Sequence, residues 1–290
     1  MFSSYDAETE LGEEEFRLLR DLIHEQFGLF FEDNQRNSLR ARLASRLTTL
    51  DLFSFEDYYR YLRFGPHREQ ELKRMISNLT NNETYFYREV GQLNAFAENV
   101  LPEIKGRKYK SAERTLCILS AGCSTGEEVY TLGMLVYDSG QFFWGWDVRV
   151  IGLDIDPIAL EKARKGLYFH NSFRGVDPAL QEKHFIPTDG GYQVKDGIRK
   201  LTEFRQGSLL AEASYEDLPP LDVVLCRNVL IYFSDGMTLQ AVSRFNAALA
   251  DEGYLLLGHA ESLARLTTSF APLRFRGAMI YQGHAPGTAS

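Results

Sequence analysis

The stretch that decides the fold reads Ser120-Ala121-Gly122-Cys123-Ser124-Thr125-Gly126-Glu127-Glu128. An apolar run from Thr115 to Ala121 leads into it and a segment with helical spacing follows it, so the pattern predicts a strand, a tight turn and a helix. Glycine at 122 and 126 lets the chain turn sharply and lets a ligand approach the backbone, because no Cβ intervenes. We expect the first strand-helix unit of a parallel sheet, with a ligand site at its turn.

Short apolar runs keep alternating with helical segments after residue 115, which is typical of a parallel sheet covered by helices on both faces. The expected strands are 115–121, 148–153, 222–226 and 253–258, and the expected crossover helices are 127–137, 157–164 and 238–250. Residues 167–206 interrupt this alternation, since they are too long for a simple connection and contain a hairpin-like stretch with Gly190-Gly191 at its turn. We interpret them as a small antiparallel insertion, and we expect a last pair of short strands within 273–281.

The first 80 residues have a different periodicity. Apolar side chains recur at three- and four-residue spacing in 14–27 and 36–50, and the pattern continues in 54–62 and 69–79 around a break at Gly65-Pro66. The predicted organisation is an all-helical domain at 1–80, a linker at 81–114, an α/β domain at 115–284 with its β-subdomain at about 167–206, and a tail at 285–290.

Composition narrows the class of protein. The 290 residues are 44% hydrophobic and 25% charged, which excludes a disordered, collagenous or coiled-coil chain. The net charge of −8 gives the whole molecule no reason to bind nucleic acid or an anionic membrane, and no apolar stretch is long enough to span a bilayer. Three scattered cysteines fit neither a disulfide framework nor a zinc site, so we expect no metal and a cytoplasmic setting.

The polar residues at the expected strand ends indicate the ligand. The glycine turn is not G-x-G-x-x-G and lacks a phosphate-loop lysine, and Glu127 and Glu128 would repel a phosphate. Asp154, at the end of the second strand, is placed to accept the hydroxyls of an adenosine ribose, whereas Asp156 before Pro157 is expected to cap a helix. A ligand with an adenosine, a cationic group and little phosphate fits this site, and S-adenosylmethionine has that chemistry.

Three further segments carry a family resemblance. They read Leu79-Thr80-Asn81-Asn82-Glu83-Thr84-Tyr85-Phe86-Tyr87-Arg88-Glu89, Cys226-Arg227-Asn228-Val229-Leu230-Ile231-Tyr232-Phe233 and Gly253-Tyr254-Leu255-Leu256-Leu257-Gly258-His259-Ala260-Glu261-Ser262. With the glycine turn, and in this order over essentially the whole chain, they strongly resemble the chemotaxis receptor methyltransferases of the CheR family.

The resemblance implies a fold and an activity. The fold is α/β, a Rossmann-like class I methyltransferase domain with a small antiparallel β-subdomain insertion, preceded by an all-α N-terminal domain. The activity is protein-glutamate O-methylation: S-adenosylmethionine methylates glutamate side chains of chemoreceptor signalling helices, giving methyl esters and S-adenosylhomocysteine. The alternatives are a methyltransferase for another substrate class and a cofactor-binding regulatory protein.

The resemblance also assigns roles to residues. Arg88 and Tyr232 are the expected catalytic residues. For Arg88 the alternative is an exposed helical arginine, and for Tyr232 a half-buried aromatic of an apolar run. Many relatives have Asn where this chain has Ser208, so we expect mainly backbone contacts there. The expected cofactor-binding residues are Asn82, Thr84, Arg88, Gly122, Glu127 or Glu128, Asp154, Ser208, Leu209, Arg227 and Asn228.

A basic stretch in the helical domain is the candidate for substrate docking. No acid occurs from Arg36 to Thr49, and Arg36, Arg40, Arg42 and Arg46 flank the leucine stripe of the expected helix. These arginines either lie beside the core with their heads in water or dock onto acidic receptor helices, and both can hold. We expect a monomer without a tether to a receptor's C-terminal pentapeptide, because the connection in the predicted hairpin is short.

Overall fold

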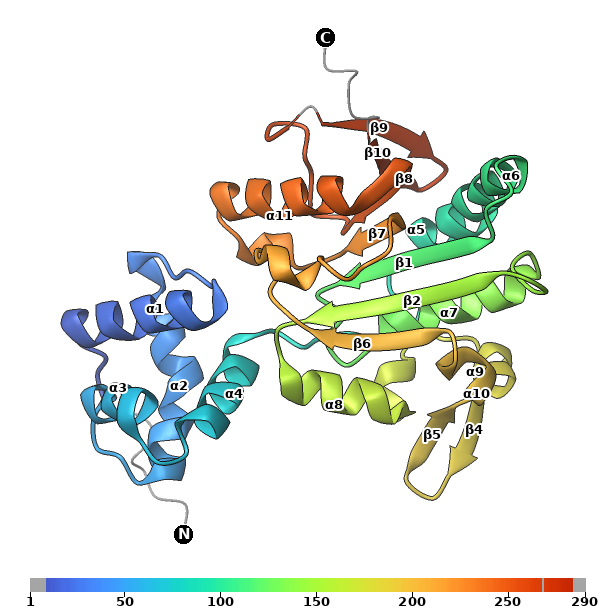
Figure 1. Ribbon diagram of the computed structural model, residues 1–290. Helices are drawn as coiled ribbons and strands as arrows, with labels where there is room; N and C mark the ends of the chain where they lie inside the picture. The colour runs from blue at the N-terminus through green and yellow to red at the C-terminus, as the bar shows by residue number, and fades with distance from the viewer. Residues whose placement is uncertain (1–8, 268, 284–290) are drawn as a thin grey trace. The chain divides into compact units, whose positions relative to one another are not determined.

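The structure, a computed structural model, describes residues 9–267 and 269–283 (Figure 1). The chain divides into two compact units. One comprises residues up to Asn82 together with Ile155–Ile158, and the other comprises Glu83–Asp154 and the residues from Ala159 onward. The predicted tail at 285–290 lies outside the described residues.

The first unit is a helical bundle. Its helices are α1 (Glu13–Phe27), α2 (Arg36–Leu50), α3 (Phe55–Phe64) and α4 (Arg68–Leu79), with a short 3-10 turn at Asp33–Gln35. The leucine stripe of α2, Leu39, Leu43 and Leu47, is buried in its core, as the periodicity predicts. All four expected helices are confirmed, with ends within two residues of the predicted ones.

The second unit is built on a seven-stranded sheet of order β6-β2-β1-β7-β8-β10-β9. The strands are β1 (Thr115–Ala121), β2 (Asp147–Asp154), β6 (Thr202–Gln206), β7 (Leu221–Cys226), β8 (Leu249–Leu257), β9 (Phe270–Phe275) and β10 (Ala278–Gly283). The first five strands in this order are parallel, and β10 and β9 close the sheet as an antiparallel pair. The strand order reverses between β1 and β7, where such sheets bind ligands.

Helices cover both faces of this sheet (Figure 1). The face with Leu116 and Ile118 packs against α5 (Val90–Ala95), a π-helical turn (Phe96–Val100), α6 (Leu101–Lys110) and α7 (Glu127–Ser139). The face with Cys117 and Leu119 packs against α11 (Asp235–Ala248). Helix α8 (Pro157–Lys165) adds Leu160 to the first of these clusters. The fold class predicted above is confirmed.

Most of the segment predicted as a linker is part of the second unit. Residues 90–110 are helical throughout, and Leu93, Phe96, Leu101 and Ile104 are buried against the sheet. The π-helical turn at Phe96–Val100 changes the spacing of the apolar residues, so the sequence of 90–110 does not show the continuous 3.6-residue periodicity of an α-helix.

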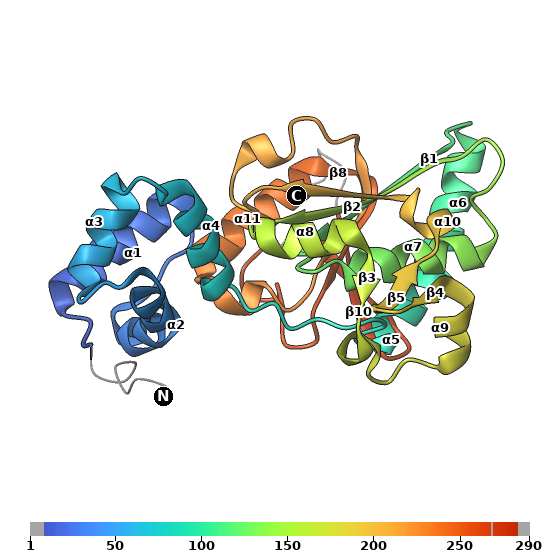
Figure 2. The same cartoon turned by 90° about the horizontal axis from the view of Figure 1, so that it is seen from below.

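A separate three-stranded antiparallel sheet of order β3-β5-β4 forms the β-subdomain, beside α9 (Pro178–His184) and α10 (Asp196–Arg199) (Figure 2). Its strands are β3 (Leu167–Tyr168), β4 (Phe185–Thr188) and β5 (Gly191–Val194). The expected insertion is present, but its predicted end was wrong: Thr202–Gln206 pairs with β2 in the large sheet. As an edge strand, β6 is only half buried, and its polar residues give no apolar run that would predict a strand of the large sheet.

Candidate active site

The candidate site of the second unit lies at the carboxyl ends of β1, β2, β7 and β8, around the point where strand order reverses. Strands β1, β2 and β7 and the segments that directly follow them carry seven predicted site residues: Gly122, Glu127, Glu128, Asp154, Arg227, Asn228 and Tyr232. The segment 83–89, which leads into α5, brings Arg88 and Glu89 to the same place, because Arg227 and Asn228 both contact it. The topology alone therefore assembles residues that are up to 139 positions apart.

The glycine turn after β1 requires its glycines for steric reasons. Gly122 has φ +80°, and a Cβ there would lie 2.5 Å from a methyl group of Val229. Gly126 has φ +91°, and a Cβ there would lie 2.8 Å from the Cβ of Ala163. Side chains at these two positions would be strained by the positive φ and would clash with Val229 and Ala163.

Asp154 ends β2 beside this turn. Its Oδ2 accepts a 2.7 Å hydrogen bond from the backbone N–H of Ser124, and its side chain is buried. The bond joins the carboxyl ends of the neighbouring strands β1 and β2 and fixes the carboxylate at that edge of the sheet. This is the position at which a ribose-binding acid was predicted.

Asp156 caps α8, as predicted, by accepting a 2.8 Å hydrogen bond from the N–H of Ile158. It also accepts a 2.8 Å bond from the side-chain amide of Asn82. Both residues belong to the first unit, so Asn82 is held there by the capping carboxylate. Thr84, another predicted cofactor residue, is half-buried on the segment 83–89.

The two glutamates after the turn have different surroundings. Glu127 is buried and accepts hydrogen bonds from the hydroxyls of Thr125, at 2.7 Å, and Ser172, at 2.9 Å, and its burial raises the pKa of the carboxyl. Glu128 accepts a 2.7 Å bond from the Ser120 hydroxyl and pairs with Arg227 at 3.0 Å. Glu127 thus links the glycine turn, through Thr125, to Ser172 in the segment that carries the β-subdomain. Glu128 instead contacts Arg227.

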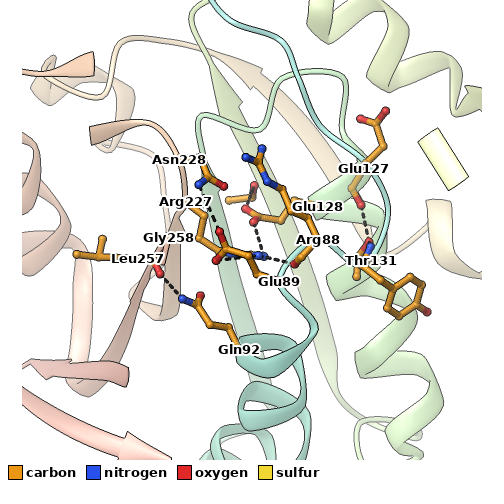
Figure 3. Close-up of polar contacts among 12 residues, drawn as sticks. Arg88, Glu89, Gln92, Glu127, Glu128, Thr131, Arg227, Asn228, Leu257 and Gly258 are labelled. Atoms are coloured by element: carbon orange, nitrogen blue, oxygen red, sulfur yellow. Dashed lines mark hydrogen bonds and ion pairs between the residues drawn. The ribbon is translucent and has the colours of Figure 1, made fainter. Parts of the chain in front are cut away.

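Arg227 is the centre of the polar network (Figure 3). Its buried guanidinium lies 3.0 Å from Oε2 of Glu128 and 3.4 Å from Oε2 of Glu89, and it donates to the carbonyl of Arg88. One cation therefore faces two carboxylates, and Asp154 adds a further acid at this edge of the sheet. A site with this excess of acids favours a cationic ligand over an anionic one.

Three polar atoms of the site make no hydrogen bond to the described residues. They are Nε of Arg227, Oδ1 of Asn228 and Oε2 of Glu89, and all three are buried. Such a buried, unsatisfied group costs about 1 to 3 kcal/mol, so it is expected where a ligand completes the bonding. The other side of the Asn228 amide is occupied, since Nδ2 donates to Oε1 of Glu89 at 3.3 Å.

Strained backbone conformations gather in the same loops. Tyr87, Glu89, Ser124 and Asn228 all have φ between +48° and +60°, a region that costs most residues about 1 to 3 kcal/mol each. Such residues persist only where surrounding contacts hold them. Their presence in the segments that carry Arg88 and Asn228 is typical of a functional site.

The segment 83–89 is anchored to the β-subdomain. The ring of Phe86 is buried, with centroids 4.8 Å, 5.2 Å and 4.9 Å from those of Tyr168, Phe173 and Phe185. Arg88 itself is partly exposed and donates to the carbonyl of Glu83 at 2.9 Å. The anchor thus holds the backbone of the segment while the Arg88 side chain lies at the surface.

The remaining predicted site residues lie on two loops. Tyr232 ends a 3-10 turn, Leu230–Tyr232, and is 49% exposed, so it is not part of the apolar core. Leu209 is buried against the α11 face of the sheet, and the Ser208 hydroxyl accepts from the N–H of Leu210 at 3.3 Å. Ser208 therefore stabilises its own turn.

The four predicted docking arginines divide into two pairs. Arg46 makes two 2.7 Å hydrogen bonds to Glu71, a buried carboxylate that also accepts from the Tyr58 hydroxyl, and Arg42 donates to the carbonyl of Leu79. Both stabilise the bundle. Arg36 is exposed and Arg40 is partly exposed, and neither pairs with an acid among residues 9–267 and 269–283.

Sequence reasoning missed Glu89 and Glu261. Glu89 contacts Arg227, Asn228 and the N–H of His259, and Glu261 accepts from four backbone N–H groups. Both residues stand in the strings quoted for the family resemblance. Their partners are backbone groups or residues over 30 positions away for the most part, so no local pattern identifies them.

The described ranges hold neither a membrane-spanning helix nor a metal-binding cluster. None of the helices there combines the length and apolar character needed to cross a bilayer. No group of three or more His, Cys, Asp or Glu residues in those ranges is arranged so that it could hold a metal ion.

Comparison with known proteins places both units in one family. A family model described as CheR methyltransferase, all-alpha domain, matches residues 14–80, and one described as CheR methyltransferase, SAM binding domain, matches residues 82–278. A Vibrio cholerae protein named chemotaxis protein methyltransferase 2 is 36% identical over 263 residues, 90% of each chain. The Escherichia coli chemotaxis protein methyltransferase is 31% identical over 276 residues, 93% of this chain and 91% of its own.

Proposed function

The chain belongs to the CheR methyltransferase family, and on that basis we propose that it transfers a methyl group from S-adenosylmethionine to glutamate side chains of chemoreceptor signalling helices. The products are glutamate methyl esters and S-adenosylhomocysteine. The observation that carries the proposal is the acid-rich site at the strand reversal, where buried Arg227 lies between Glu89 and Glu128. Relatives named chemotaxis protein methyltransferase, which align over nine-tenths of the chain, support the chemotactic substrate.

The residues of the site fit S-adenosylmethionine. The glycine turn, fixed by the close packing of Gly122 on Val229, presents its backbone beside Asp154. Asp154 is fixed where ribose hydroxyls could donate to it, and the acids around Arg227 suit a positively charged sulfur. Nε of Arg227 and Oδ1 of Asn228 are a free donor and a free acceptor for the polar methionine end.

When bound, the cofactor supplies a methyl group already activated by a positively charged sulfur. A glutamate side chain, with an ordinary pKa of about 4.3, is ionised at neutral pH and needs no base to remove a proton. The work left to the protein is alignment and exclusion of water. We propose that Arg88 holds a carboxylate with its planar donors and that Tyr232 covers the pocket.

We propose that the helical unit docks the substrate. Arg36 and Arg40 are surface cations of α2 without acidic partners among the described residues, so they are available to acidic receptor helices. The β4–β5 connection has only Asp189 and Gly190 between the paired residues Thr188 and Gly191, which supports action without a pentapeptide tether. We also propose a monomer in the cytoplasm; the three free, buried cysteines support the compartment.

The test is incubation of the protein with tritiated S-adenosylmethionine and receptor fragments. The proposal predicts label on the fragment that alkali releases as volatile methanol, and excess S-adenosylhomocysteine should suppress it. Label that survives alkali would assign the chain to another substrate class. Binding of cofactor with no label on any fragment would favour a regulatory role.

A further inference from the structure

Glu261 occupies an unusual position between two loops of the site. It is 9% exposed, and it lies in the loop after β8. Its Oε2 accepts from the N–H of Gly258 at 2.6 Å and of Asn228 at 2.9 Å. Its Oε1 accepts from the N–H of Val229 at 2.9 Å and of Ile231 at 3.3 Å. One carboxylate thus binds four backbone donors from two loops.

These donors belong to backbone whose conformation needs contacts from outside the loop. Asn228 has φ +60°, and Val229 and Ile231 follow it into the 3-10 turn that ends at Tyr232. The two loops also touch closely, since a Cβ at Gly258 would lie 2.8 Å from the backbone nitrogen of Asn228. Without an acceptor between them, four N–H groups would face one another unsatisfied.

We propose that Glu261 is a positioning residue for methyl transfer. Its carboxylate fixes the loop after β7, so that Arg227, Asn228 and Tyr232 keep the arrangement in which the polar atoms of the first two face the cofactor. The proposal rests on the function proposed above, because it gives these residues their cofactor. Among the described residues, the Glu261 carboxylate makes its hydrogen bonds to backbone N–H groups, so it acts on Arg227 and on the Asn228 side chain through the backbone.

The charge of Glu261 is part of this role. The described residues provide it with backbone N–H dipoles in place of a lysine or arginine partner, and a ring of such dipoles is an anion-binding arrangement. Glutamine has almost the same shape but replaces one oxygen with an NH₂ group, which would point donors at donors. Aspartate keeps the charge but is one methylene shorter, so it reaches fewer of the four N–H groups.

The experiment compares Glu261→Gln and Glu261→Asp with Asp222→Asn. Asp222 is another buried carboxylate, at the other end of β7, where it accepts from the N–H of Cys117 at 2.9 Å and from Lys108 at 2.7 Å. It stabilises the same strand without contacting the site. Affinity for S-adenosylhomocysteine is measured by calorimetry at a temperature where circular dichroism shows each variant folded, and kcat is measured with receptor fragment.

A displacement of about 1 Å at a site can cost roughly 100-fold in reaction rate, so we expect Glu261→Gln to lose kcat on that order and also to bind S-adenosylhomocysteine more weakly. Glu261→Asp should fall between it and the wild type. Asp222→Asn should melt earlier yet bind the ligand like the wild type. The proposal would be overturned if Glu261→Gln kept the wild-type affinity and kcat, or if Asp222→Asn lost as much of both. If Glu261→Gln does not fold, wild-type affinity in Glu261→Asp would overturn it instead.

The affinity measurement needs no receptor, which separates the two proposals. If the wild type binds S-adenosylhomocysteine but esterifies no receptor, the proposed function fails. The affinities of the Glu261 variants for S-adenosylhomocysteine still test the positioning role in that case. If Glu261→Gln binds and turns over like the wild type, only the positioning role fails.

Discussion

Arg227 decides the electrostatics of the site at the scale of single residues. Its side chain is 3% exposed and lies within 3.4 Å of two carboxylates, Glu89 and Glu128. If the buried cation is removed, the two carboxylates lose their positive partner. This lowers the free energy of unfolding by far more than the loss of a surface ion pair does. Lysine cannot replace it, because a point charge lacks the planar fork that serves two acids and a carbonyl at once.

Arg227→Lys should therefore fold but bind S-adenosylhomocysteine at least about tenfold more weakly, while Arg227→Met should also lose about 3 to 5 kcal/mol of unfolding free energy. Calorimetric titration and urea denaturation measure these effects. Arg107→Lys is the matched control, since Arg107 pairs at the surface with Glu252, whose side chain is 61% exposed. Wild-type affinity in Arg227→Lys would contradict the central place given to this residue.

Two glycines, one in the turn after β1 and one in helix α6, provide a second test at the scale of single residues. Gly122→Ala should destabilise the protein by more than about 1 kcal/mol, because the new Cβ meets Val229 at 2.5 Å in a backbone conformation with φ +80°. Gly106→Ala, in the exposed middle of α6, meets nothing within 4 Å and should stabilise by about 0.5 to 1 kcal/mol. Thermal denaturation of both variants checks the signs; a neutral Gly122→Ala would show that the turn is not tightly packed.

The raised pKa of Glu127 gives a prediction for pH. Burial raises its pKa in the folded state, so the folded protein binds the proton more tightly than the unfolded chain, and stability falls as pH rises from the unfolded pKa through the folded one. Glu127→Gln should remove this fall and leave stability flatter across the acidic range. Urea denaturation at several pH values measures it.

Glu83 supplies a control of opposite sign for that experiment. Its hydrogen bond to Arg174 lowers its pKa, so its contribution is present above the unfolded pKa and is lost as pH falls. Glu83→Gln should change the profile in the direction opposite to Glu127→Gln. A Glu127→Gln profile parallel to that of the wild type would contradict the assignment.

At the scale of elements, the segment 83–89 depends on the β-subdomain. Phe86→Ala should cost about 3 to 5 kcal/mol by leaving a cavity among Tyr168, Phe173 and Phe185. It should also increase hydrogen exchange of residues 83–89, which mass spectrometry can follow. Phe64→Ala, at an 83% exposed position of α3, should change neither quantity. Unchanged exchange in 83–89 would show that the subdomain does not hold this segment.

How far the sequence predicted each element depends on its burial. Strands β1, β2 and β7 are buried on both faces and read as apolar runs, so their ends were predicted within one residue. The half-buried edge strand β6 and the helices interrupted by a π-helical turn have no such clean pattern. Strand-end acids such as Asp154 were predictable from topology, whereas the partner of Arg46 lies 25 residues away and was not.

At the scale of the whole molecule, the net charge of −8 cannot attract acidic receptor helices, so docking must depend on local cations. Arg36→Glu with Arg40→Glu should raise KM for a receptor fragment severalfold or more while leaving S-adenosylhomocysteine affinity unchanged, and the wild-type KM should rise with salt. Steady-state methylation assays measure both. Changing Arg46 as well would remove a buried ion pair and confuse docking with folding.

Arg60→Glu is the matched control for this double variant, because Arg60 is an exposed arginine of the same unit that already pairs with Glu56. It should leave KM close to the wild-type value. A double variant with an unchanged KM would show that Arg36 and Arg40 do not contact the substrate.

The most direct test of the proposed activity is peptide mass spectrometry of a chemoreceptor cytoplasmic fragment after incubation with the protein and S-adenosylmethionine. We predict one added methyl group per modified site, located on glutamate side chains, removed by alkali, and strongly reduced when Arg227→Lys replaces the wild type. Methylation on any other residue type, or a fragment that stays unmodified while the protein binds the cofactor, would contradict the assignment as a protein-glutamate methyltransferase.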